Sequence, residues 1–227
     1  MDLVSQSSGP DIEERIYEEM LEAVLAQRLR PGMKLGEQWM AETYRISRAR
    51  VRRVLLRLIQ DQIVTQHPNR GAFVAQPSLA EAKDIIDTRR ALEGRVIQRV
   101  AASLTSHDVR DLRALIAAEK KARQKGDRAI ALKVGGEFHL KLAEFAGNRV
   151  TYGLLRDLVL RTSLAIAQTG TDRRDTCTAD DHPKILRALR LGEHERAADL
   201  MDEHLRAVER SLWKQTDFGR DLERRSA

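Results

Sequence analysis

Residues 47–58 read SRARVRRVLLRL, and this stretch decides the fold of the first part of the chain. Ser47 is a good helix N-cap residue, because its hydroxyl can accept a hydrogen bond from a free backbone N–H. Arg48 and Arg52 are four residues apart, so they lie on neighbouring turns of one side. Apolar residues recur at i, i+3, i+4 and i+7, the spacing of one buried helix face; they are Val51, Val54, Leu55 and Leu58. The stretch therefore predicts a capped amphipathic helix with a basic outer side.

Two helical patterns precede this helix, and two β-prone runs follow it. Apolar residues recur at helical spacing over residues 12–24, the turn Leu29-Arg30-Pro31-Gly32 ends that helix, and residues 39–44 indicate a second, shorter one. Residues 63–66 and 72–75 flank a turn at residues 67–71, which predicts a hairpin. Three helices followed by a two-stranded hairpin are typical of a winged helix-turn-helix, whose last helix enters the DNA major groove.

The rest of the chain predicts an antiparallel all-helical bundle. We place a domain boundary at Pro77-Ser78. Six helices are expected beyond it, at residues 79–102, 107–125, 127–146, 149–169, 178–191 and 193–216. The expected fold class is therefore mainly α. It comprises a flexible tail at residues 1–10, a winged helix-turn-helix DNA-binding domain at 11–76 and a helical domain at 77–227.

The composition is that of a soluble globular protein, with 42% hydrophobic and 33% charged residues. No run approaches the roughly 18 apolar residues of a membrane span, and residues 1–10 lack the pattern of a signal peptide. We therefore expect no membrane association and a cytoplasmic location. The single cysteine, Cys177, cannot form an intrachain disulfide, and we interpret it as an ordinary loop thiol.

The basic charge is concentrated locally. The net charge of +6 favours anionic partners, but acidic residues crowd residues 11–22, whereas no acidic residue lies between Thr43 and Gln60. An arginine there can bind guanine or phosphate bidentately. Gly71 at the hairpin tip permits a close approach to the DNA backbone, with Asn69 and Arg70 beside it. These features favour DNA binding over the alternative of a merely solvated basic face.

The first part of the chain resembles the GntR family of transcription regulators. The resemblance is carried by Leu29-Arg30-Pro31-Gly32, Ala41-Glu42, residues 47–52 and residues 68–74. It implies DNA contacts from residues of the recognition helix and the wing, with a phosphate contact from the second helix; the residues are Arg48, Ala49, Arg50, Arg52, Gly71 and Gln38. Many relatives carry Thr-Pro at Ala49-Arg50 and an acid at Arg53, so the operator preference stays open.

Residues 78–213 resemble the FCD ligand-binding domain of the FadR subfamily. The markers are residues 87–93, 137–139, 147–148, 181–186 and 201–205. Many such domains hold a divalent metal through one Asp and three His, and the metal helps to bind an organic acid. The resemblance places the three histidines at His139, His182 and His204 and a pocket arginine at Arg89, with Asn148 as a further ligand-binding position.

The position of the expected aspartate is occupied by Gly135. Glu137 cannot simply replace it, because two residues turn a helical side chain by about 200°. Two interpretations stay open: a zinc- or nickel-like ion held by three His and completed by water or a ligand oxygen, or a site without metal that binds its ligand through hydrogen bonds. Arg89 has an alternative as an exposed i, i+4 partner of Glu93.

The resulting prediction is a ligand-responsive regulator that binds a palindromic operator as a homodimer and senses a small carboxylate. The resemblance favours repression. A metalloenzyme that uses the three-His site and a DNA-architectural protein without an effector are the alternatives. The sequence has no HExxH motif, phosphate-binding loop or nucleophile elbow, so we expect no enzyme.

Overall fold

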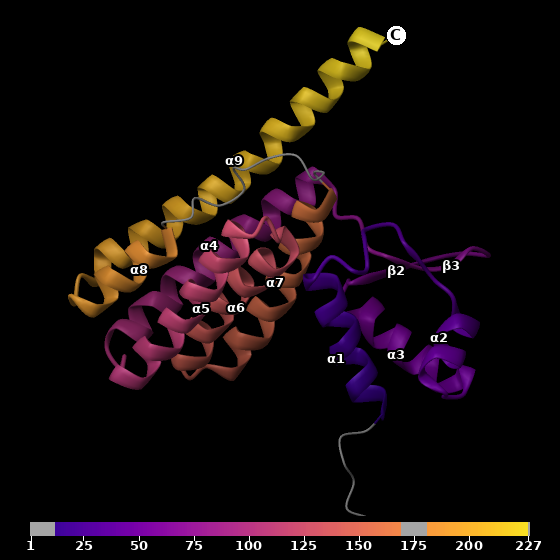
Figure 1. Cartoon of the computed structure of the whole chain (residues 1–227), viewed down its shortest axis with the longest axis horizontal. Helices are drawn as coiled ribbons and strands as arrows, with labels where there is room; N and C mark the ends of the chain where they lie inside the picture. Colours follow the sequence, from indigo (N-terminus) through magenta and orange to yellow (C-terminus); the bar gives the residue numbers. More distant parts are fainter. Residues whose placement is uncertain (1–11, 169–180, 227) are drawn as a thin grey trace, which may run out of the picture.

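The computed structural model describes residues 12–168 and 181–226, with the side chains of residues 12–168 and 181–213. Its first part contains α1 (Ile12–Leu25), β1 (Lys34–Leu35), α2 (Glu37–Tyr44), α3 (Arg48–Gln60), β2 (Val64–His67) and β3 (Gly71–Val74). These elements lie together beside a larger group of helices (Figure 1). The predicted tail at residues 1–10 and the loop that contains Cys177 lie outside the described residues.

The tight turn between α2 and α3 forms as the sequence predicts. Arg45 ends α2 in the left-handed region, with φ 53°, and Ser47 then caps α3 by accepting a hydrogen bond from the Arg50 N–H. The apolar face of α3 is buried against the first two helices and the sheet. A helix-turn-helix followed by a wing is therefore the architecture of residues 12–75.

The wing is a three-stranded sheet rather than the two-stranded hairpin that we predicted. The strand order is β1-β3-β2, and both pairings are antiparallel. Lys34 pairs with Phe73 and Leu35 with Ala72, so the short segment after the Pro31-Gly32 turn covers one edge of β3. A two-residue strand is too short to show alternation in sequence, which is why it was missed.

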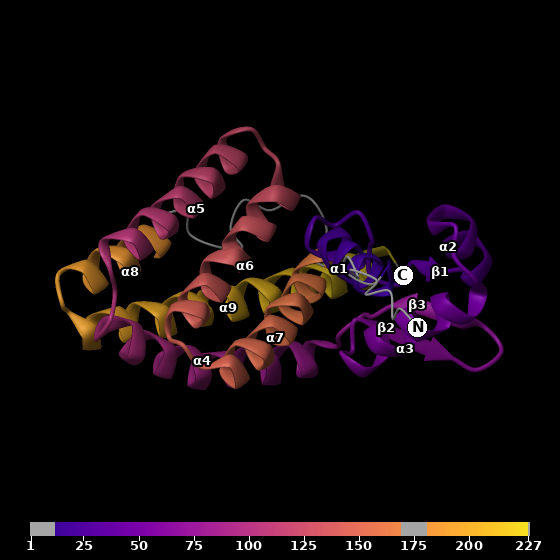
Figure 2. The same ribbon diagram turned by 90° about the horizontal axis from the view of Figure 1, so that it is seen from below.

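The described residues of the second part form helices joined by short turns. It comprises α4 (Leu79–Ala101), α5 (Ser106–Gln124), α6 (Arg128–Phe145), α7 (Arg149–Gln168), α8 (Asp181–Arg190) and α9 (His194–Ser226). The number of helices agrees with the prediction, whereas α9 ends about ten residues later than expected, and its last part runs past the other helices (Figure 1). Helices α5 and α6 run side by side, as do α8 and α9 (Figure 2).

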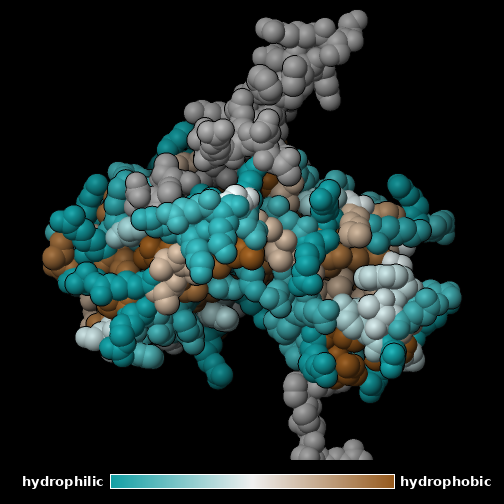
Figure 3. Space-filling model, viewed as in Figure 1, coloured by the Kyte–Doolittle hydropathy of each residue, from teal (hydrophilic) through white to brown (hydrophobic). Residues whose placement is uncertain are grey.

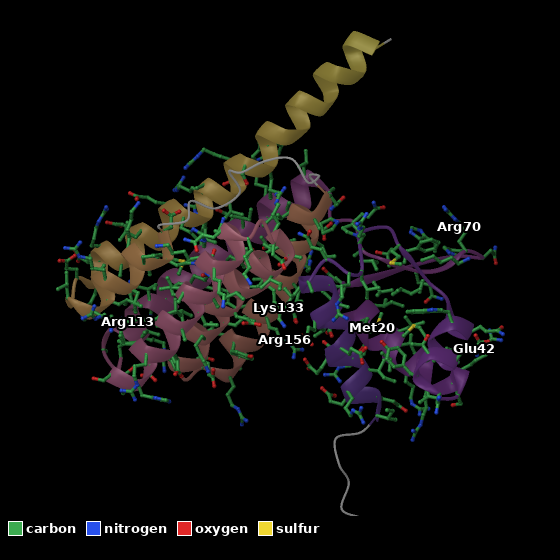
Figure 4. The ribbon with its side chains drawn as sticks, viewed as in Figure 1. Met20, Glu42, Arg70, Arg113, Lys133 and Arg156 are labelled. Carbon is green, nitrogen blue, oxygen red and sulfur yellow. The ribbon has the colours of Figure 1, made fainter. Side chains whose placement is uncertain are left out.

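Two apolar cores hold the chain together, and α7 contributes to both. Leu155 lies in the core of the bundle, whereas Leu160 and Leu164 pack into the core of the winged part. Lys133 and Arg156 lie toward α1 (Figure 4), where Lys133 pairs with Glu22. The two parts are therefore joined by packing and ion pairs as well as by the chain.

Hydrophilic residues cover most of the face shown in Figure 3, and apolar residues there form separate patches. None of the described helices is both long enough and apolar enough to span a lipid bilayer.

Candidate nucleic-acid interface and metal centre

The outer side of α3 presents two arginines that share one acidic partner. Arg48 and Arg52 have side chains that are 61% and 60% exposed. Their guanidinium nitrogens lie 3.3 Å and 2.9 Å from Glu37 Oε2, respectively. Glu37 is the first residue of α2. Because both arginines pair with it, they lie on the same side of the helix-turn-helix. Exposed pairs of this kind contribute only about 0–1 kcal/mol, so an anionic partner can displace them.

Three other arginines of α3 turn toward α1. Arg50 and Arg53 pair with Glu13 at 3.3 Å and 2.5 Å, and Arg57 pairs with Glu14. The hydrogen bond from Arg53 holds the pKa of Glu13 below its usual value. Glu13 and Glu14 are distant from α3 in the sequence, but in the folded chain they neutralise part of its positive charge. A DNA contact by Arg50, which the family resemblance implies, stays a prediction and requires this side chain to leave Glu13.

The turn of the wing has the backbone that its sequence indicates. Asn69 and Gly71 have positive φ angles of 59° and 96°. Residues with short side chains or none adopt this region most readily. Arg70 lies at the outer end of the β2–β3 hairpin (Figure 4), with its guanidinium carbon 5.5 Å from the centre of the Phe73 ring. The tip is exposed and basic, as DNA-backbone contact requires.

Two further predicted contact residues are exposed. The Gln38 side-chain amide donates to Glu42 Oε1 at 3.0 Å, on the exposed side of α2. Ala49 follows Arg48 at the start of α3 and is also exposed. Their proposed DNA contacts stay predictions.

The three predicted histidines converge inside the bundle. His139 comes from α6, His182 from α8 and His204 from α9. Each of these residues is only 2–4% exposed to solvent. One ligand nitrogen of each lies within 4.8 Å of the others. The Phe138 ring stacks on His182 with a centroid distance of 4.3 Å and covers one side. The sequence prediction of convergence is confirmed.

Each imidazole is backed by a carboxylate. The Nδ1 atoms of His139, His182 and His204 lie 2.5 Å from Glu93, 2.7 Å from Glu119 and 3.3 Å from Asp181. A neutral imidazole that donates from Nδ1 to a carboxylate presents the lone pair of Nε2 as a metal ligand. The arrangement is that of histidine ligands oriented from outside a coordination sphere.

Electrostatics favour neutral imidazoles beside ionised carboxylates. Burial lowers the pKa of His139 to about 3 and also lowers the pKa of His204. Burial raises the pKa of Glu93, but Arg89 and His139 outweigh it and bring that pKa to about 2. Hence the imidazoles of His139 and His204 keep the neutral form in which they can bind a cation.

Two buried polar atoms at this site have no hydrogen-bond partner among the described residues. They are Nε2 of His182 and the NH2 nitrogen of Arg89. Arg89 is 3% exposed, and its Nε donates to Glu93 at 2.8 Å. The i, i+4 pairing with Glu93 is therefore present, but the alternative of an exposed pair is wrong. Unpartnered buried donors and acceptors are uncommon in folded proteins, so both atoms indicate a ligand.

The remaining predicted site residues have separate surroundings. Gly135 is buried in α6, one turn before His139. Asn148 caps α7, because its Oδ1 accepts hydrogen bonds from the Val150 and Thr151 N–H groups at 3.1 Å. A ligand contact by Asn148 stays a prediction, and its side-chain oxygen already serves the helix.

Sequence reasoning missed the roles of Glu119 and Asp181. Glu119 lies in a highly charged helix, α5, where its spacing does not distinguish it from solvated neighbours. Asp181 directly precedes His182 in the segment 181–186 that resembles the FCD domain, and this adjacency is the one sequence feature that points to its role.

The residues present fit a zinc- or nickel-like ion. Such ions prefer neutral imidazole nitrogens at about 2.0–2.1 Å, and all three donors here are of that type. Side-chain movements of about an ångström would bring nitrogens within 4.8 Å of one another to that distance. His139, His182 and His204 would hold the ion.

Comparison with known proteins agrees with this architecture. The FCD domain family matches residues 84–207, more than half of the chain. The family described as bacterial regulatory proteins, gntR family, matches residues 12–74. The chain belongs to the GntR family. This membership confirms the predicted resemblance and the predicted combination of a winged helix-turn-helix with an FCD domain.

Individual relatives are distant in sequence. An HTH-type transcriptional regulator in an unstable DNA locus of Streptomyces ambofaciens is 26% identical over 215 residues, which cover 90% of this chain and 86% of that protein. The HTH-type transcriptional repressor RspR of Escherichia coli is 21% identical over 147 residues, 65% of this chain. The match spans 64% of the length of RspR, just under two thirds. The structure of Escherichia coli McbR/YncC has a TM-score of 0.82 at 19% identity and covers 92% of this chain and all of that one, which supports the fold.

Proposed function

We propose that this GntR-family protein is a ligand-responsive transcription regulator that reads operator DNA with α3 and senses a small carboxylate in its FCD domain. The observation that carries the proposal is the convergence of three buried, carboxylate-backed imidazoles in the helical part. Two buried polar atoms of this cluster, His182 Nε2 and the NH2 nitrogen of Arg89, have no partner among the described residues and are available to a ligand.

DNA binding is supported by the shared direction of Arg48 and Arg52. Both are exposed, and Glu37 holds them together on the outer side of α3. On DNA, guanine edges or phosphates replace Glu37 as their acceptors, at little cost because the exposed pairs are weak. The wing adds Arg70 at its tip, which is suited to a sugar-phosphate contact.

The sensor is proposed to hold one divalent ion on His139, His182 and His204. When bound, the ion supplies a positive centre at which a carboxylate oxygen can bind. Arg89 is the second anchor, because its free NH2 nitrogen can donate to the same carboxylate. If the site holds no metal, the imidazoles and Arg89 bind the carboxylate through hydrogen bonds alone.

We further propose that the protein is a cytoplasmic homodimer that represses transcription from a palindromic operator. Helix-turn-helix regulators read two half-sites through two-fold symmetry. The relative RspR is described as a repressor, which supports that sign of regulation. Sedimentation equilibrium should give twice the mass of the 25.8 kDa chain.

The test is the operator affinity of the full-length protein on a duplex selected by that protein from a random pool. Fluorescence anisotropy is measured with zinc, with nickel or with a chelator, each in the presence and absence of small mono- and dicarboxylates. A regulator changes its affinity with at least one of them, by the 5- to 150-fold or so that is typical of allosteric coupling. An architectural protein without an effector binds DNA equally under all conditions, and that result would refute the sensing function.

A further inference from the structure

The backbone of Gly135 faces a carboxylate from the neighbouring helix. A Cβ atom at this position would lie 3.4 Å from Glu119 Oε1 and 3.6 Å from His182 Cε1. Helices α5 and α6 run side by side (Figure 2), so Glu119 reaches toward α6 from the helix next to it. A side chain at residue 135 would therefore contact the side chain of Glu119 beside His182.

Both oxygens of Glu119 are already used in this position. Oε1 accepts hydrogen bonds from Arg123 at 2.6 Å and 3.1 Å, and Oε2 lies 2.7 Å from His182 Nδ1. The Glu119 side chain is only 9% exposed. It is thus a fixed, buried and ionised group, with Arg123 as the anchor that orients it.

Glu119 contacts the side of the His182 ring that is opposite to the unpartnered nitrogen. Its contact is with Nδ1, whereas Nε2 of the same ring is buried and has no partner among the described residues. Of the acidic, histidine and cysteine side chains described, the group close enough to share an ion comprises only the three histidines. Glu119 is therefore adjacent to the centre without belonging to its ligand set.

We propose that Glu119 supplies the carboxylate that residue 135 does not, acting from outside the coordination sphere as the positioning residue of His182. The inference rests on the metal site proposed above. Gly135 is then a requirement of this arrangement, because an acidic side chain there would meet a second, buried carboxylate.

Other acids near the cluster do not fit this role. Glu137 has a side chain that is 39% exposed, and it lies 3.9 Å from Lys133 on another side of α6. Glu93 and Asp181 already back the other two histidines. Glu137 therefore serves as the matched control, an acidic residue of α6 close to Gly135 that does not back a histidine.

The test is a double-mutant cycle in zinc affinity, measured on the full-length protein by competition with a chelating dye. Glu119→Gln should weaken zinc binding by about 10- to 100-fold, the usual effect of removing a carboxylate behind a ligand histidine. Gly135→Asp alone should bind zinc no more tightly than the wild type, because its carboxylate meets Glu119. The double variant should bind at least tenfold more tightly than Glu119→Gln. Glu137→Gln and Gly135→Ala should stay within about threefold of the wild type.

Cobalt absorption adds a readout that separates positioning from direct coordination. The Co²⁺ spectrum should keep its shape in Glu119→Gln while its affinity falls, because the ligand set is unchanged. A changed shape would mean that Glu119 is itself a ligand, and it would overturn the inference.

Two affinity results also overturn it: wild-type affinity in Glu119→Gln, or a tenfold tightening by Gly135→Asp alone. The second decides the matter even if Glu119→Gln does not fold, as circular dichroism would show. A folded wild type that binds neither zinc nor cobalt refutes the proposed metal site and this inference together, and is thereby distinguishable from failure of the inference alone.

Discussion

Replacing Tyr17 with phenylalanine should destabilise the junction between the winged part and the bundle. Tyr17 is fully buried, and its hydroxyl donates a hydrogen bond to Asp61. The same hydroxyl oxygen of Tyr17 accepts a hydrogen bond from Arg156 of α7 at 3.0 Å. Burial, followed by the hydrogen bond to Asp61, raises the pKa of Tyr17, so the hydroxyl keeps its proton. One oxygen thus connects α1, the end of α3 and the bundle.

The magnitude follows from what the variant removes. A hydrogen bond to a charged group contributes about 1.5–3 kcal/mol, and phenylalanine fills the same space without a cavity. Arg156 is 29% exposed and can turn to water, which places the total loss near the lower end, at about 2 kcal/mol. For a chain of this size, that corresponds to a fall in Tm of roughly 4–8 °C.

Urea unfolding followed by circular dichroism measures this loss. Tyr44→Phe is the matched control, because its hydroxyl has an exposed partner, Glu19, at 3.3 Å and should cost less than about 0.5 kcal/mol. A Tyr17→Phe variant as stable as Tyr44→Phe would refute the assigned role of this hydroxyl at the junction.

Three further outcomes are expected. Arg48→Ala and Arg52→Ala should each weaken operator binding, measured by anisotropy, by about 1–3 kcal/mol. Arg53 turns toward α1, so Arg53→Ala should weaken operator binding by well under about 1 kcal/mol. Equal losses in all three variants would contradict the assigned DNA-facing side of α3. Leu164→Ala should reduce the free energy of unfolding by about 2–5 kcal/mol, because this fully buried α7 residue packs in the winged core, and a loss below 1 kcal/mol would argue against that packing. Burial raises the pKa of Asp202, but hydrogen bonds from two arginines outweigh burial, and the net pKa is lowered. The ionised Asp202 therefore stabilises the fold above about pH 4, and this stabilisation is lost as the pH falls further. Asp202→Asn should therefore lower the urea midpoint more at pH 7 than at pH 3, and a pH-independent effect would contradict this sign.

Much of the fold could be predicted because its signals are local. The cap at Ser47, the apolar spacing of α3 and the glycine at the wing turn each depend on a few neighbouring residues. Strand β1 could not be predicted, because two residues carry no period, and its identity depends on pairing with β3. The contribution of Leu164 to the winged core is likewise a long-range contact without a sequence pattern.

The site was predictable only in part, for a similar reason. The family resemblance located His139, His182 and His204, although nothing in their spacing alone brings them together. It could not reveal Glu119, because a glutamate in a charged helix looks solvated until the fold turns it inward against His182. In α3, the pairing of Arg50 and Arg53 with Glu13 was hidden because opposite charges were separated along the chain but not in space.

The most direct test of sensing through the three histidines is the effect of zinc and an active carboxylate on operator affinity in three proteins. These are the wild type, His182→Ala, which removes one convergent imidazole, and His194→Ala, which removes an exposed histidine elsewhere. We expect the wild type and His194→Ala to show the same ligand-dependent change in Kd, and His182→Ala to bind the operator with no response. A response in His182→Ala as large as that of the wild type would contradict the account.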